Sequence, residues 1–174
     1  MPVRVPSVTA RLTRGNGTST FSDPKNREYQ SLLPGAKWSD LGHVPVIWKN
    51  APDADLTRQP GRYGFADLVQ IVAEPWERSG GPAWMTATHT EEGYVWFSLK
   101  DPAVLNSTVI WIENHGRHGH PWNGRNQCIG LEDVTAHFAD GLAASAGENV
   151  LTREGVATAV ELRPGQPSAV NYIQ

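Results

Sequence analysis

Three histidines stand close together in one polar stretch of the chain. His115, His118 and His120 fall within six positions, beside Glu113, Asn114 and Arg117. Neutral imidazoles and carboxylates are ligands for transition metals. The same side chains also supply hydrogen-bond donors and acceptors for a polyhydroxylated ligand. The stretch therefore predicts a functional site of one of these two kinds.

A metal site is the first alternative. His115, His118 and His120 would share an ion in a small cupin-like enzyme, with Glu113 or Glu132 completing the ligands. The spacing His-x-x-His-x-His is not an established zinc pattern, and Arg117 would bring a cation beside the metal. We therefore expect no metal and favour recognition by hydrogen bonds.

The residues that follow strengthen the second alternative. Trp122, Asn123 and Arg125 come directly after the histidines, in a chain with seven tryptophans. An indole offers a flat apolar face to the C–H groups of a sugar ring, and its N–H can donate to a hydroxyl. The segment 115–132 is thus expected to form the wall of a carbohydrate site.

The elements that must position this wall are β-strands. Runs of β-branched and aromatic residues bounded by turn residues predict strands at 67–74, 83–90, 93–100, 108–113 and 128–132, with a tight turn at 91–93. Weaker patterns predict a strand at 44–49 and a closing hairpin of 157–163 with 169–173. Apolar spacing predicts one short helix over 134–145. Both faces of 93–100 are largely apolar, so this strand is expected inside a layered structure.

The chain length and these patterns predict one domain. At 174 residues the chain can bury a sizeable core, and 17 glycines with 13 prolines favour many turns and short strands. Residues 1–29 are expected to form a flexible N-terminal arm or an edge strand, and residues 30–174 an all-β antiparallel β-sandwich. The apolar run at 169–173 indicates an unfinished sheet edge, which makes a homodimer a candidate assembly.

Charge and hydropathy exclude several classes of partner. The net charge is −3 and gives no basic field for a phosphate backbone, so nucleic acid is not expected. No window is long and apolar enough for a membrane span, and the N-terminus lacks a secretory signal pattern. Cys128 is the single cysteine, which is compatible with a reducing compartment. We expect a cytoplasmic protein.

Several motifs in order resemble a known family. The pattern RHxxPWNGR at 117–125 is followed by Gly-Leu-Glu at 130–132, and GFADLVQIV, EEGYVWFSLKDP and AVNYIQ occur at 64–72, 91–102 and 169–174. Together they resemble the C-terminal half of proteins in a poorly characterised branch of the aldose 1-epimerase (galactose mutarotase-like) superfamily. The resemblance extends from about Leu32 to Gln174.

This resemblance implies a half or compact version of a β-supersandwich and an isomerase that interconverts sugar anomers. A glutamate would be the general base and a histidine the general acid. Glu132 matches the family's strand-borne base, and His118 is the local candidate for the acid, because the family's upstream Asn-His-x-x-Phe segment is missing here. Proton transfer of this kind implies no cofactor. The residues expected to contact the sugar are His115, Arg117, His120, Trp122, Asn123 and Arg125.

The same resemblance leaves a non-catalytic alternative. The family's sandwich needs a longer chain, and its acid histidine has no counterpart here. A carbohydrate-binding module without turnover, or a half-domain that dimerises to rebuild a sandwich, therefore stands beside the epimerase.

Overall fold

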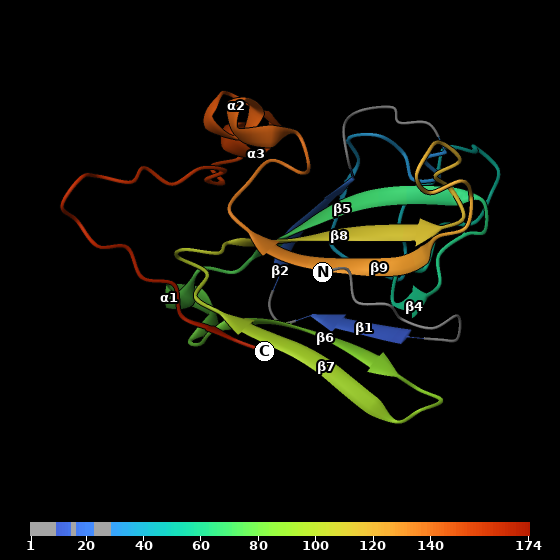
Figure 1. Cartoon of the computed structure of the whole chain (residues 1–174), viewed down its shortest axis with the longest axis horizontal. Coiled ribbons are helices and arrows are strands. Elements are labelled where there is room, and N and C mark those ends of the chain that lie inside the picture. The colour runs from blue at the N-terminus through green and yellow to red at the C-terminus, as the bar shows by residue number, and fades with distance from the viewer. Residues whose placement is uncertain (1–9, 15–16, 23–28) are drawn as a thin grey trace.

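Two five-stranded antiparallel sheets form the protein (Figure 1). The computed structural model describes residues 10–14, 17–22 and 29–174. Sheet A has the spatial order β3 (Lys37–Trp38), β2 (Gly17–Ser22), β5 (Phe65–Ala73), β8 (Ser107–Asn114) and β9 (Gln127–Val134). Sheet B has the order β10 (Tyr172–Ile173), β7 (Tyr94–Lys100), β6 (Ala83–His89), β1 (Ala10–Arg14) and β4 (Arg58–Gln59). The predicted all-β antiparallel sandwich is confirmed.

The five long strands of the central region form where β-branched and aromatic residues are concentrated. β5, β6, β7, β8 and β9 each coincide with a predicted strand to within a few residues. The β6–β7 hairpin turns at Gly93, whose φ of 70° lies in the left-handed region and whose N–H donates to the His89 carbonyl at 2.9 Å. The turn residue and the strand pattern therefore agree, which fixes the register of this pair.

The N-terminal strands differ from the expectation of an arm or edge strand over residues 1–29. β1 pairs with β6 on one side and β4 on the other, and β2 pairs with both β3 and β5. The described parts of this region therefore belong to the interior of both sheets, and the rest of it lies outside the described residues. Backbone hydrogen bonds can hold such Thr- and Ser-rich strands although their side chains give a weak pattern.

Three other predictions are wrong in part. Residues 44–49 make isolated bridges at Val44 and Val46 and no continuous strand. The closing hairpin does not form, because residues 157–171 have no regular structure and β10 pairs with β7 instead. The predicted helix is replaced by α2 (Gly141–Ala146), because Phe138 at φ 45° and Gly141 at φ 83° interrupt the helical backbone.

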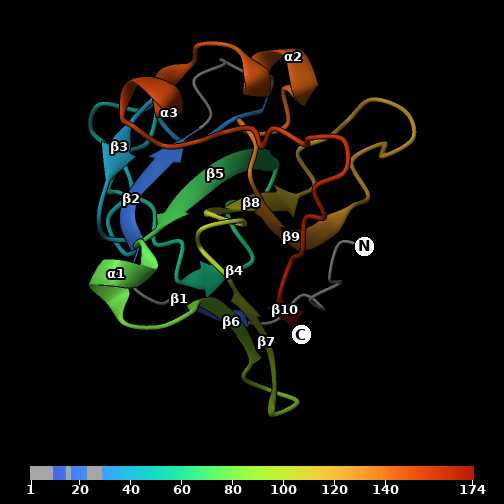
Figure 2. The ribbon, with the colours of Figure 1, turned by 90° about the vertical axis from the view of Figure 1, so that its left-hand side faces the viewer.

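Helical structure is limited among the described residues to α1 (Trp76–Ser79), α2 and α3 (Val150–Arg153). No helix in this part of the chain is long and apolar enough to cross a membrane. Asn149 caps α3 by accepting hydrogen bonds from the backbone N–H groups of Leu151 and Thr152. This cap holds α3 in place beside sheet A (Figure 2).

Apolar side chains form two clusters on opposite sides of sheet A. The larger cluster lies between the sheets and includes Val69, Met85, Ile110 and Ile129. The smaller cluster lies on the outer side of sheet A and consists of Leu68, Val72, Val109, Phe138 and Leu151. Gln70 fixes the chain over this outer side, since its amide donates to the Ala136 carbonyl at 2.8 Å and accepts from the Phe138 N–H at 2.9 Å.

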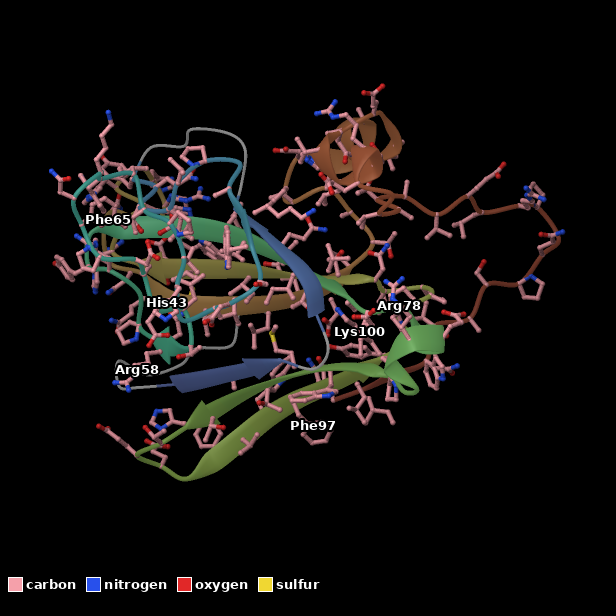
Figure 3. The ribbon with its side chains drawn as sticks, turned by 180° about the vertical axis from the view of Figure 1, so that it is seen from behind. His43, Arg58, Phe65, Arg78, Phe97 and Lys100 are labelled. Carbon is pink, nitrogen blue, oxygen red and sulfur yellow. The ribbon has the colours of Figure 1, made fainter. Side chains whose placement is uncertain are left out.

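A buried ion pair joins the two sheets at one end. The Lys100 ammonium on β7 lies 2.6 Å from the Asp133 carboxylate on β9, and each side chain is 2% exposed (Figure 3). Thr108 and Tyr172 also donate to this carboxylate, at 2.6 and 3.0 Å. Burial alone would raise the pKa of Asp133, but the Lys100 ammonium and the hydrogen bonds from Lys100 and Thr108 together lower it below its ordinary value.

The outer side of sheet B remains exposed. Phe97 points outward from β7 (Figure 3) and is 43% exposed. Val95 on the same strand is 54% exposed, and Trp84 and Ile173 are also exposed. The expectation that β7 lies inside the structure is therefore wrong for this face. No described segment of the chain covers these apolar residues.

Candidate functional site

A cleft of about 420 Å³ opens at the end of sheet A where β8 leads into β9. Its walls come from three parts of the chain: the segment entering at Tyr29, strands β5 and β8, and the β8–β9 loop. A volume of this size is within the range of small-molecule sites. The lining residues are Tyr29, Gln30, Ala66, Asp67, Leu68, Trp111, Arg117, His118, Gly119, His120 and Trp122.

The β8–β9 loop is anchored against the neighbouring strand at Gly116. A Cβ atom at this position would lie 2.2 Å from the Phe65 carbonyl carbon and 2.4 Å from the Ala66 nitrogen, so the close approach requires glycine. Glu113 ends β8 and accepts hydrogen bonds from the backbone N–H groups of Gly116 and Arg117, at 2.8 and 3.0 Å. The start of the loop is thus held rigidly on β5 and β8.

Hydrogen bonds across the loop determine which side chains enter the cleft. The Gly124 N–H donates to the Arg117 carbonyl at 2.8 Å, and the His115 Nδ1 lies 2.7 Å from the Gly124 carbonyl. Because a carbonyl can only accept, this Nδ1 carries the hydrogen. The ring of His115 packs against Tyr63 at 4.9 Å, so His115 closes the loop from outside the cleft.

Two tryptophans form the apolar wall. Trp111 projects from the outer face of β8, opposite Gly130 on β9, where the missing side chain leaves room for its ring. Trp122 meets it edge to face at 5.4 Å between ring centroids and remains 36% exposed. His118 packs against Tyr29 in a similar edge contact at 4.4 Å. The cleft therefore presents aromatic faces beside polar edges.

The polar groups of the cleft are mainly basic. Arg117 holds its guanidinium 5.9 Å above the Trp111 ring, and His118 and His120 lie on the same wall. Asp67 accepts hydrogen bonds from the Ser31 hydroxyl and from the N–H groups of Ser31 and Leu32. Burial raises the pKa of Asp67, and these hydrogen bonds offset the effect in part.

The structure brings together half of the residues that the sequence proposed for the site. Arg117, His118, His120 and Trp122 line the cleft. The residues outside the lining are His115, Asn123, Arg125 and Glu132. Asn123 and Arg125 are exposed on the far part of the loop, where Asn123 and Gly124 take left-handed φ values of 50° and 65° and reverse the chain.

Glu132 lies near the cleft without lining it. Its side chain is exposed on β9, on the same face of sheet A as Trp111. One carboxylate oxygen lies 3.1 Å from the position that a Cβ atom of Gly130 would occupy. Glu132 is therefore close to the Trp111 side of the site and separate from the wall that carries His118.

Sequence reasoning missed several lining residues. Tyr29 belongs to the region expected to be an arm, Gln30 begins the predicted domain, and Asp67 and Leu68 lie in a predicted strand that was not assigned to the site. A charged residue within the apolar run of β5 was a usable signal for Asp67, because a buried carboxylate needs partners. No local pattern identified Tyr29.

The metal alternative finds no support in the described residues. Among them, no group of three histidine, cysteine, aspartate or glutamate side chains is arranged to hold an ion. His115 is turned toward Tyr63 and Gly124, away from the wall that carries His118 and His120. The three histidines thus lie in at least two different environments.

Comparisons with known proteins found no match. No family model matches this chain, and the searches of the curated proteins and of the solved structures returned no match. The function must therefore be argued from the cleft.

Proposed function

We propose that the cleft beside the β8–β9 loop binds a sugar or a closely related polyhydroxylated molecule. The observation that most directly supports this proposal is that the Trp111 and Trp122 rings line one cleft together with Arg117, His118 and His120. Apolar ring faces suit the C–H faces of a sugar, and the imidazoles and the guanidinium suit its hydroxyls. The motif resemblance to sugar epimerases supports the same class of ligand.

Isothermal titration with a panel of monosaccharides tests this proposal. Trp122→Ala should weaken binding by about tenfold, the loss expected for one aromatic stacking contact. Trp84→Ala is the matched control, since Trp84 is 38% exposed against 36% for Trp122 and lies on sheet B. An equal loss of sugar affinity in both variants, or no binding of any sugar by the wild type, would contradict the proposal.

Turnover is an extension of this proposal. His118 lines the cleft, which supports its assignment as the general acid. Glu132 lies outside the lining, so its assignment as the base rests on the family resemblance. Glu132→Gln should abolish catalysed anomer exchange, followed by NMR exchange spectroscopy, and leave sugar binding largely intact. Unchanged exchange in this variant would remove Glu132 from the mechanism and leave a binding module.

The exposed side of sheet B supports a second function as a half-domain that pairs with another copy. The outward side chains of β6, β7 and β10 are uncharged, so two copies can meet there without like-charge repulsion. Trp84, Phe97 and Ile173 would form the apolar centre of an interface that typically buries about 800 Å² per partner. Sedimentation of the wild type should show a dimer, and Phe97→Ser a monomer. A wild type that stays monomeric at high concentration excludes this function.

A further inference from the structure

The charged groups around the cleft differ in whether they have a partner of opposite charge. Seven ion pairs connect described residues, and none of them includes Arg117. The Arg117 guanidinium faces the Trp111 ring and has no carboxylate partner in this part of the protein. A guanidinium in a partly closed cleft is a strong binding group for an anion.

Asp67 and Glu113, two carboxylates beside the cleft, accept hydrogen bonds from other donors. Asp67 accepts from the Ser31 hydroxyl at 2.6 Å and from two backbone N–H groups. Glu113 is buried beneath the loop, where one oxygen accepts from the backbone of Gly116 and Arg117. Both carboxylates hold the backbone of the site, and neither one forms an ion pair with the guanidinium.

The basic groups also stand on one wall. Arg117 and His120 come from a loop of a few residues, with His118 between them, and all three line the cleft. The other lining residues include Tyr29, Gln30 and Leu68, and the Tyr29 ring contacts His118. A hydroxylated ligand with one negative group matches this set of side chains better than a neutral sugar does.

We infer that the cleft selects a sugar carrying an anionic group, a carboxylate or a phosphate, which the Arg117 guanidinium binds. This inference rests on the proposed sugar-binding function and names the class of sugar. A guanidinium can bind either anion through two parallel hydrogen bonds, and hydrogen bonds to charged groups are worth more than those between neutral groups. The preference should weaken at high salt.

Paired ligands that differ in the anionic group test the inference. Isothermal titration compares glucose with glucuronate and with glucose 6-phosphate, and adds inorganic phosphate. At least one acidic sugar should bind about 10- to 100-fold more tightly than glucose. The better of the two acidic sugars identifies the carboxylate or the phosphate as the preferred group.

Variants of two arginines in the same loop separate the possible outcomes. Arg117→Gln should bring the affinity for the acidic sugar close to that for glucose. Arg125→Gln is the control, since Arg125 is exposed on the same loop outside the cleft, and should keep the preference. Equal binding of neutral and acidic sugars by the wild type, or loss of the preference in Arg125→Gln alone, would overturn the inference while the sugar site stands. Inorganic phosphate binding as tightly as the acidic sugars would instead refute the sugar site and leave an anion site.

Discussion

The outer faces of the two sheets are built from similar strands but are covered by the chain to different extents. On sheet A, the chain from Ala136 to Arg153 and the β8–β9 loop cover the face, and the uncovered remainder is the cleft. On sheet B, no described segment covers the outward side chains of β6, β7 and β10, which are uncharged and include Trp84, Phe97 and Ile173. Sheet A therefore offers a shaped cleft, to which the proposed sugar site is assigned, whereas sheet B offers an open apolar face.

The largest effect is expected where the two sheets are tied together. Lys100→Met leaves the buried Asp133 carboxylate without its counter-ion and should lower the free energy of unfolding by about 3–5 kcal/mol, measured by urea denaturation. The double variant with Asp133→Leu should recover much of this loss, because no buried charge then remains. A double variant as unstable as Lys100→Met would show that the hydrogen bonds of Asp133 outweigh the ion pair.

The segment from Ala136 to Arg153, the cover of sheet A, should be the next most sensitive to substitution. Leu151→Ala removes a fully buried side chain from the outer cluster and should cost about 2–5 kcal/mol of unfolding free energy. Leu142→Ala is the matched control, because Leu142 lies in the same cover and is 80% exposed. Similar losses in the two variants would mean that the cover does not pack as described.

The pH dependence of stability tests the same ion pair. The lowered pKa of Asp133 means that its contribution is present above the aspartate pKa of the unfolded chain, about 3.9, and is lost as the pH falls through the lower folded value. The stability gap between wild type and Asp133→Asn should therefore narrow below about pH 4. Asp53→Asn, at an exposed position, serves as the control. A stability difference that stays constant as the solution is acidified would contradict the lowered pKa of Asp133.

The smallest effect is expected on the outer face of sheet B. Phe97→Ala removes a side chain that is 43% exposed, so the unfolding free energy of the monomer should fall by less than about 1 kcal/mol. Urea denaturation at low protein concentration checks this value against Leu151→Ala. A loss as large as that of Leu151→Ala would mean that the face of sheet B is covered in solution, which removes the contrast between the two faces.

The sequence predicted the central sheet well and its surroundings poorly. Strands β5 to β9 carry strong local patterns of β-branched and aromatic residues, which is why their positions could be predicted. β1 and β2 could not, because their sequences give only a weak apolar alternation and backbone pairing holds them in the sheets. The helix prediction over 134–145 was wrong for its first half, because Phe138 packs against sheet A in a left-handed conformation that no periodicity reveals, and α2 forms only in the second half.

The sequence by itself determined that a loop rich in histidine, arginine and tryptophan follows a buried strand. The tertiary structure decided which of these side chains share a cleft. Gly116 holds the loop against β5, the His115–Gly124 contact turns one histidine away, and Tyr29 contacts His118 from far along the chain. Side-chain direction in a loop depends on such nonlocal contacts and on left-handed residues, so residue type and spacing alone could not separate Arg117 from Arg125.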